Sequence, residues 1–191
     1  MKKILVAGIG NIFQGDDAFG CEVLRQLNPD TFSDEVALMD FGIRSYDLAY
    51  ALTDPYETVI LVDAVGRGQP AGTLYLIEPT VEGSGAVDAH SMNPVAAIQM
   101  ARALGGVKAK LYLIGCEPKV LESDNGEMGL SAEVNAALPQ AIAMIESLVK
   151  GKENYEHNSG GNSDHRGGDR RDTDHRDPNN AAGASAVYAN S

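Results

Sequence analysis

The amino-acid sequence predicts an α/β fold: a three-layer sandwich with a mostly parallel, twisted five-stranded sheet, helices on both faces and one antiparallel edge strand. Three observations lead to this prediction. Short apolar runs alternate with longer amphipathic stretches along residues 1–150. These runs lack polar alternation, which is typical of parallel strands buried on both faces. One connection between two runs is too short for a crossover helix, so the strand after it is expected to run antiparallel.

The first strand is expected at residues 3–7, and the turn after it organises the rest of the chain. Gly8-Ile9-Gly10-Asn11 follows the strand, and Gly15-Asp16-Asp17 then opens a helix expected at residues 18–27. In an open α/β sheet, ligands bind at the carboxyl ends of the strands. The sequence therefore places two adjacent carboxylates at the end of the sheet where a site is expected.

The other elements follow in order along the chain. Apolar, β-branched runs predict four further strands, at residues 35–39, 58–62, 73–77 and 110–114. Helix start and stop signals, including Pro55, Pro94 and a Ser131 N-cap, predict three further helices, at residues 46–52, 94–104 and 131–149. The turn at residues 68–72 is the short connection that makes the 73–77 strand antiparallel.

Composition divides the chain into one folded domain, residues 1–150, and a disordered polar tail, residues 151–191. The tail has almost no aliphatic side chains, so little apolar burial would offset the entropy cost of ordering it. The net charge is −12, of which −10 falls in residues 1–150, and this acidity disfavours nucleic acid and anionic membranes as partners. Two distant cysteines, no signal-peptide pattern and no membrane-spanning apolar run indicate a cytoplasmic protein.

Three strands end in acidic residues: the first near Asp17, the second at Asp40 and the third at Asp63. The first and third strands of a doubly wound sheet are commonly neighbours, so Asp17 and Asp63 are expected side by side. Aspartate is also common in turns, but gathered carboxylates repel one another unless a cation or a proton lies between them. His90, the one histidine of residues 1–150, precedes the third helix at the same end of the sheet. Two carboxylates and an imidazole suit Zn²⁺, Ni²⁺ or Mn²⁺; a surface histidine is the alternative.

Two other kinds of site resemble this pattern. A dinucleotide-binding turn is excluded because Phe13 stands where the third glycine of the fingerprint belongs. A phospho-receiver domain also keeps an acidic pair after its first strand and an aspartate after its third, around Mg²⁺. That fold needs a Ser or Thr after strand four and a Lys before a Pro after strand five. Here Glu78 follows strand four and Lys119 comes after Pro118, so the receiver domain ranks second.

Seven short motifs, taken in order and at their spacings, resemble those of the hydrogenase maturation proteases. They are Gly8-Ile9-Gly10-Asn11, Asp16-Asp17-x-x-Gly20, Asp40-x-Gly42, Val62-Asp63-Ala64, His90 with Pro94, Gly115-Cys116-Glu117-Pro118, and Gly129-Leu130-Ser131. The resemblance covers about residues 3–149. Many relatives carry Glu at the position of Asp17, and relatives often carry Thr at the position of Ile43, which bears on which precursor is recognised.

The resemblance implies an endopeptidase that removes a C-terminal peptide from the nickel-loaded large subunit of a nickel-iron hydrogenase. It implies that Asp17, Asp63 and His90 are both the catalytic residues and the metal ligands. The implied metal is nickel, held by the protease or supplied by the precursor, and Zn²⁺ or Cd²⁺ can substitute for it. The implied partner is the hydrogenase large-subunit precursor. A nickel-checkpoint chaperone that binds the precursor without cutting it is a further alternative.

Overall fold

The structure is a computed structural model that describes residues 2–79, 94–120 and 128–159, with side chains described as far as residue 152. In these ranges the strands are β1 (Ile4–Ile9), β2 (Val36–Gly42), β3 (Thr58–Ala64), β4 (Leu74–Ile77) and β5 (Lys110–Cys116). The helices are α1 (Phe19–Gln26), α2 (Ser45–Ala51), α3 (Pro94–Leu104) and α4 (Ala132–Ser159), with short 3₁₀ helices η1 (Gly15–Ala18) and η2 (Pro29–Thr31).

The five strands form one sheet in the order β2-β1-β3-β5-β4. β1 pairs in parallel with β2 and β3, and β3 pairs in parallel with β5, whereas β4 runs antiparallel to β5 at the edge. The predicted fold class, with its antiparallel edge strand, is therefore confirmed. The register places Gly8 of β1 opposite Asp40 of β2 and Val62 of β3. Side chains that follow these three strands consequently gather at one end of the sheet.

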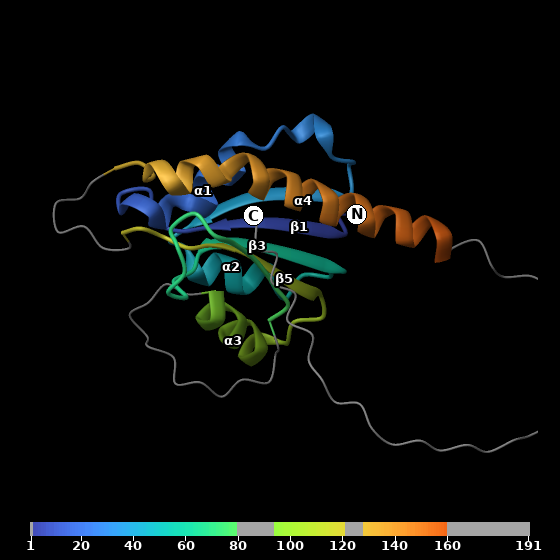
Figure 1. The fold of residues 1–191 in the computed structure, drawn as a ribbon. Coiled ribbons are helices and arrows are strands. Elements are labelled where there is room, and N and C mark those ends of the chain that lie inside the picture. Colours follow the sequence, from blue (N-terminus) through green and yellow to red (C-terminus); the bar gives the residue numbers. More distant parts are fainter. Residues whose placement is uncertain (1, 80–93, 121–127, 160–191) are drawn as a thin grey trace, which may run out of the picture.

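Helices cover both faces of the sheet, α1 and α4 on one face and α2 and α3 on the other (Figure 1). Each face has its own apolar core, and the central strands contribute alternate side chains to the two. On β1, Val6 packs in the core beneath α1 and α4, whereas Leu5 packs in the core beneath α2 and α3. Burial on both faces explains why these strands show apolar runs without alternation.

Two backbone carbonyl groups of the outer strand β2 accept hydrogen bonds from cationic side chains. The Lys2 Nζ donates to the Val36 carbonyl oxygen at 2.7 Å, and the Arg44 Nη2 donates to the Asp40 carbonyl oxygen. Cationic residues at the edge of a sheet oppose pairing with another strand. The exposed edge of β2 is thus partly capped from within the chain.

Most predicted elements begin and end within three residues of the observed ones, but the predicted end of the last helix, near Val149, is wrong. α4 continues to Ser159. In the added part, the Lys152 Nζ donates to the Tyr112 hydroxyl at 2.7 Å and lies 4.8 Å from the centre of that ring. Adding residues to an existing helix costs far less than starting one, so a polar stretch can continue α4 past Val149.

Several predictions concern residues that the structure does not describe. The expected domain boundary at residue 150 falls within α4, and residues 160–191 of the predicted tail lie outside the described residues, so their disorder stays a prediction. His90 also lies outside the described ranges. None of the described helices is both long and apolar enough to cross a bilayer.

Candidate active site

The carboxyl ends of β1, β2 and β3 carry the acidic residues that the sequence predicted there. Asp17 lies in η1, directly after the turn that follows β1. Asp40 and Asp63 lie near the carboxyl ends of β2 and β3. β1 lies between the other two strands, so the three carboxylates approach from neighbouring strands. The predicted proximity of Asp17 and Asp63 is consistent with the pKa of Asp63, which the charge of Asp17 raises.

Two glycines allow η1 and α1 to pack this closely on the sheet. A Cβ atom on Gly20 would lie 2.2 Å from the Val62 carbonyl oxygen and 2.3 Å from that of Ile9. A Cβ on Gly10, whose φ is +133°, would lie 1.8 Å from the Asp17 carbonyl oxygen. Any larger side chain would push η1 and α1 away from the strands. The two glycines therefore set the distance between Asp17 and the end of β3.

Asp63 is almost fully buried, with 5% of its surface exposed. Its Oδ1 accepts a hydrogen bond from the Ala64 N–H at 2.9 Å. Burial raises the pKa of Asp63 well above its ordinary value, and the charge of Asp17 raises it further, which outweighs the hydrogen bond from Ala64. In the absence of a cation, the site therefore favours a proton on Asp63.

Asp17 is half-buried and is held by the turn after β1. Its Oδ2 accepts a hydrogen bond from the Asn11 N–H at 2.7 Å. Burial raises the pKa of Asp17, and the Asn11 hydrogen bond opposes that rise by stabilising the charged form. Two carboxyl groups with raised pKa values at one end of a sheet are typical of a functional site.

Cys21 lies among the acidic residues, and the sequence analysis did not identify it as part of the site. It follows Asp17 by four residues, the spacing that places two side chains on the same side of a helix. Its Sγ lies 3.5 Å from the Gly10 carbonyl oxygen. Burial, followed by the charge of Asp40, raises the pKa of Cys21 to about 12, so the thiol is protonated at neutral pH. Cys21 consequently does not provide a nucleophile.

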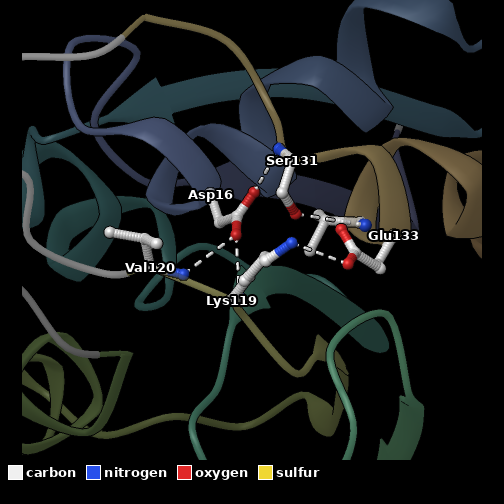
Figure 2. Close-up of polar contacts among 6 residues, drawn as sticks. Asp16, Lys119, Val120, Ser131 and Glu133 are labelled. Atoms are coloured by element: carbon white, nitrogen blue, oxygen red, sulfur yellow. Dashed lines mark hydrogen bonds and ion pairs between the residues drawn. The ribbon is translucent and has the colours of Figure 1, made fainter.

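Asp16 and Asp17 are adjacent in the sequence, but their side chains have different roles. The buried Asp16 carboxylate accepts hydrogen bonds from the N–H groups of Lys119 at 2.7 Å, Val120 at 3.1 Å and Ser131 at 2.6 Å (Figure 2). It thereby joins the segment after β5 to the residue before α4. With all of these contacts inside the protein, Asp16 supports the structure around the site and leaves Asp17 as the acidic residue of the pair that is available to a ligand.

A second buried carboxylate, that of Glu117, holds the turn between β3 and β4. It accepts hydrogen bonds from the N–H groups of Arg67 and Gly68 at 2.8–2.9 Å and from the Tyr75 hydroxyl at 2.5 Å. These hydrogen bonds lower the pKa of Glu117 although burial acts in the opposite direction. Glu117 is therefore a charged structural residue, and the Gly115-Cys116-Glu117-Pro118 motif has a clear structural role.

The predicted metal ligands are only partly described. The charge of Asp17 raises the pKa of Asp63, so these two carboxyl groups lie near each other, whereas His90 lies outside the described residues. Within the described ranges, no group of three or more His, Cys, Asp or Glu side chains is arranged to hold a metal ion. The trio of Asp17, Asp63 and His90 therefore stays a prediction.

With the fold and these residues in place, comparison with known proteins is decisive. A family model described as hydrogenase maturation protease matches residues 21–148. The chain belongs to the hydrogenase maturation protease family. The family assignment made from the motifs is thereby confirmed, and the antiparallel β4 gives a structural reason to set aside the all-parallel receiver domain.

Relatives of this maturation protease match it over most of its folded length. Coenzyme F420 hydrogenase subunit delta of Methanothermobacter thermautotrophicus is 34% identical over 149 residues, which cover 75% of this chain and 92% of that protein. The crystal structure of a hydrogenase 2 maturation peptidase from a Thaumarchaeota archaeon is 30% identical and has a TM-score of 0.61, covering 78% of this chain and 99% of the other. The hydrogenase maturating endopeptidase HybD of E. coli has the same fold, with a TM-score of 0.65 and 23% identity, over 80% of this chain and 94% of HybD.

Proposed function

We propose that this maturation protease removes a C-terminal peptide from the nickel-loaded large subunit of a nickel-iron hydrogenase, with Asp17, Asp63 and His90 at the active site. The observation that supports this most is the buried Asp63 carboxyl beside Asp17, at the carboxyl ends of β1 and β3, in a chain of this family. The proposed reaction takes place in the cytoplasm. The two cysteines of the protein are buried free thiols, as is usual in a reducing compartment.

The donor set fits a divalent cation. Asp17 and Asp63 supply carboxylate oxygens whose mutual repulsion a cation would relieve, and His90 would add an imidazole nitrogen. A cation bound there would polarise the scissile carbonyl and lower the pKa of an attacking water molecule. Nickel is the proposed cation, and Zn²⁺ or Cd²⁺ is expected to replace it. If the precursor carries the nickel, the same three residues recognise a loaded large subunit.

The protein's own groups supply the proton transfers. A carboxyl group whose pKa lies well above the ordinary value can accept a proton from the attacking water and return it to the leaving amine. Asp63 could accept this proton only in its charged form, which a bound cation would favour, and the burial of Asp63 would favour the protonated form that follows. Asp17 is oriented by the Asn11 N–H, which leaves its other carboxylate oxygen for the ligand. The thiol of Cys21 stays protonated, so no covalent thioester step is proposed.

The test is to incubate the purified chain with a nickel-loaded large-subunit precursor and to measure the mass of the precursor. We expect loss of a short C-terminal peptide with the wild-type chain, and none with Asp63→Asn or with His90→Ala. Leu104→Ser, a substitution of an exposed residue at the end of α3, serves as the control and is expected to cut normally. Cleavage by a chain that carries both Asp63→Asn and His90→Ala would contradict the assigned roles.

The same experiment separates the alternatives. A nickel-checkpoint chaperone would bind the precursor tightly and leave its C-terminus unchanged. A receiver domain would form an acyl-phosphate on Asp63 when it is incubated with acetyl phosphate, and we expect none.

A further inference from the structure

A large, mostly apolar groove lies between α1 and β2, next to the candidate active site. Its volume is about 790 Å³, within the usual range for ligand-binding clefts. The α1 side contributes Cys21 and Leu24, and β2 contributes Leu38 and Asp40. Cys21 and Asp40 also line a smaller adjoining hollow of about 290 Å³ that reaches Gly10 and Asn11. The groove is thus continuous with the turn that holds Asp17.

Two large apolar side chains on the walls of this groove are strongly exposed. Ile12, in the turn after β1, is 45% exposed, and Met128, in the segment before α4, is 69% exposed. Both line the groove although they are far apart in the sequence. Exposed apolar residues that gather around a concave surface, next to polar groups, mark a site of interaction with a partner. Here the partner would cover both side chains.

The charges of the groove restrict what can bind there. On the α1 side, Glu22 and Arg25 neutralise one another through a hydrogen-bonded ion pair of 2.6 Å. At the end nearest the candidate active site, the Asp40 carboxylate accepts a hydrogen bond from the Gly42 N–H, and Arg44, which donates to the Asp40 carbonyl oxygen, is the one cationic residue among those that line the adjoining hollow. Asp17 and Asp63 lie beyond Asp40, so the described acidic groups at this end outnumber that cation. An acidic group on the partner would be repelled at this end. The occupant is therefore apolar and carries no acidic residue next to the carboxylates.

From these features we infer that the groove binds the C-terminal extension of the hydrogenase large-subunit precursor. This inference rests on the proposed function and adds the surface that holds the substrate. The extension lies along the apolar groove, covers Ile12 and Met128, and enters the active site past Asp40. Binding outside the reacting atoms would then contribute to substrate affinity, whereas Asp17, Asp63 and His90 carry out the cleavage.

Photo-crosslinking identifies the occupant. p-Benzoylphenylalanine is placed at position 12 or 128 of the full chain, and at position 104 as the control, since Leu104, at 48%, is about as exposed as Ile12 and belongs to α3 on the other face of the sheet. After irradiation with the nickel-loaded precursor, mass spectrometry locates the crosslinked segment. We expect crosslinks from positions 12 and 128 to the C-terminal extension and none from position 104. Crosslinks to another part of the precursor, or between two copies of this chain, would overturn the inference.

Kinetics and binding provide the second test. The double substitution Ile12→Ser with Met128→Ser is expected to raise KM about tenfold or more and to leave kcat unchanged, because it removes apolar contact area away from the reacting atoms. Leu104→Ser should match the wild type. An unchanged KM in the double variant, with normal cleavage, contradicts the groove and leaves the proposed function intact. If the wild-type chain binds the precursor but never cuts it, the proposed function fails, and the crosslinks still decide whether the groove holds the extension.

Discussion

The Asp16 carboxylate accepts a hydrogen bond of 2.6 Å from the N–H of Ser131, which lies 115 residues further along the chain. The same carboxylate accepts hydrogen bonds from Lys119 and Val120, so one side chain connects η1, the segment after β5 and the start of α4. These connections lie directly beside Asp17. The stability of this corner of the protein therefore depends on a residue that has no role in the proposed chemistry.

Replacing Asp16 by Asn is expected to reduce the free energy of unfolding by about 2–4 kcal/mol, measured by urea denaturation. An asparagine side chain has a single acceptor oxygen, so its NH₂ group must face one of the three N–H donors. Glu133→Gln provides the matched control, because it removes only the exposed ion pair with Lys119 in the same region (Figure 2). We expect no measurable change for the control. Equal effects of the two substitutions would contradict the role assigned to Asp16.

Asp63→Asn is expected to raise the melting temperature at pH 8 by about 3–5 °C in the absence of metal. The pKa of Asp63 is raised on folding, so the folded protein holds this proton more tightly than the unfolded chain does. Stability from this group is fully present below the unfolded pKa and is lost as pH rises through the folded value. The variant cannot lose that stability, and its Oδ1 can still accept from the Ala64 N–H.

Calorimetry at several pH values checks this prediction. The difference in melting temperature between Asp63→Asn and the wild type should shrink as the pH approaches 4. A difference that is independent of pH would show that the carboxyl group does not titrate as described. The same variant is expected to have lost cleavage, so that stability and activity change in opposite directions.

Gly20→Ala is expected to destabilise the protein by about 3 kcal/mol or more, since the new methyl group would lie far inside the contact distance of two backbone carbonyl oxygens. Backbone atoms of β1 and β3 cannot move aside as a flexible side chain can. Gly105→Ala is the control, because nothing lies within 4 Å of the Cβ it would add. Thermal denaturation of both variants gives the comparison, and a stable Gly20→Ala protein would mean that η1 and α1 do not pack as closely as described.

Cys21 is expected to react very slowly with iodoacetamide at pH 8 in the folded protein. A thiol whose pKa is about 12 is only about one ten-thousandth ionised at that pH, and the side chain is buried as well. Mass spectrometry of the peptide that contains Cys21 measures the rate. Unfolding in urea should increase that rate by at least about a hundredfold. Fast alkylation of the folded chain would indicate a thiolate and would make Cys21 a possible nucleophile.

Much of the fold could be predicted from the sequence because its strands are apolar on both faces and its connections are short or helical. Those features predict the five strands, the neighbouring positions of β1 and β3, and the antiparallel β4. They also placed Asp17 near Asp63. The different roles of Asp16 and Asp17 could not be predicted, since adjacent residues differ only in the direction of their side chains, and the partners of Asp16 are more than 100 residues away.

Two further features depended on contacts that a local pattern does not contain. Cys21 follows Asp17 at helical spacing, which was a usable signal, but its proximity to Asp40 depends on the pairing of β1 with β2. The continuation of α4 past Val149 was missed because the prediction relied on apolar periodicity. The contact of Lys152 with Tyr112 of β5 involves a polar side chain, so that periodicity could not detect it.

The two cations on the carbonyls of β2 affect how a substrate can be selected. A polypeptide that added a sixth strand there would have to displace both Lys2 and Arg44, and strand addition takes much of its affinity from main-chain groups that every sequence shares. Because strand addition at β2 is disfavoured, the protease is expected to distinguish one hydrogenase precursor from another by how well the precursor's side chains fit the groove. Exchanging groove residues between two such proteases should therefore exchange their preferences, without any change to the acids that we propose carry out the cleavage.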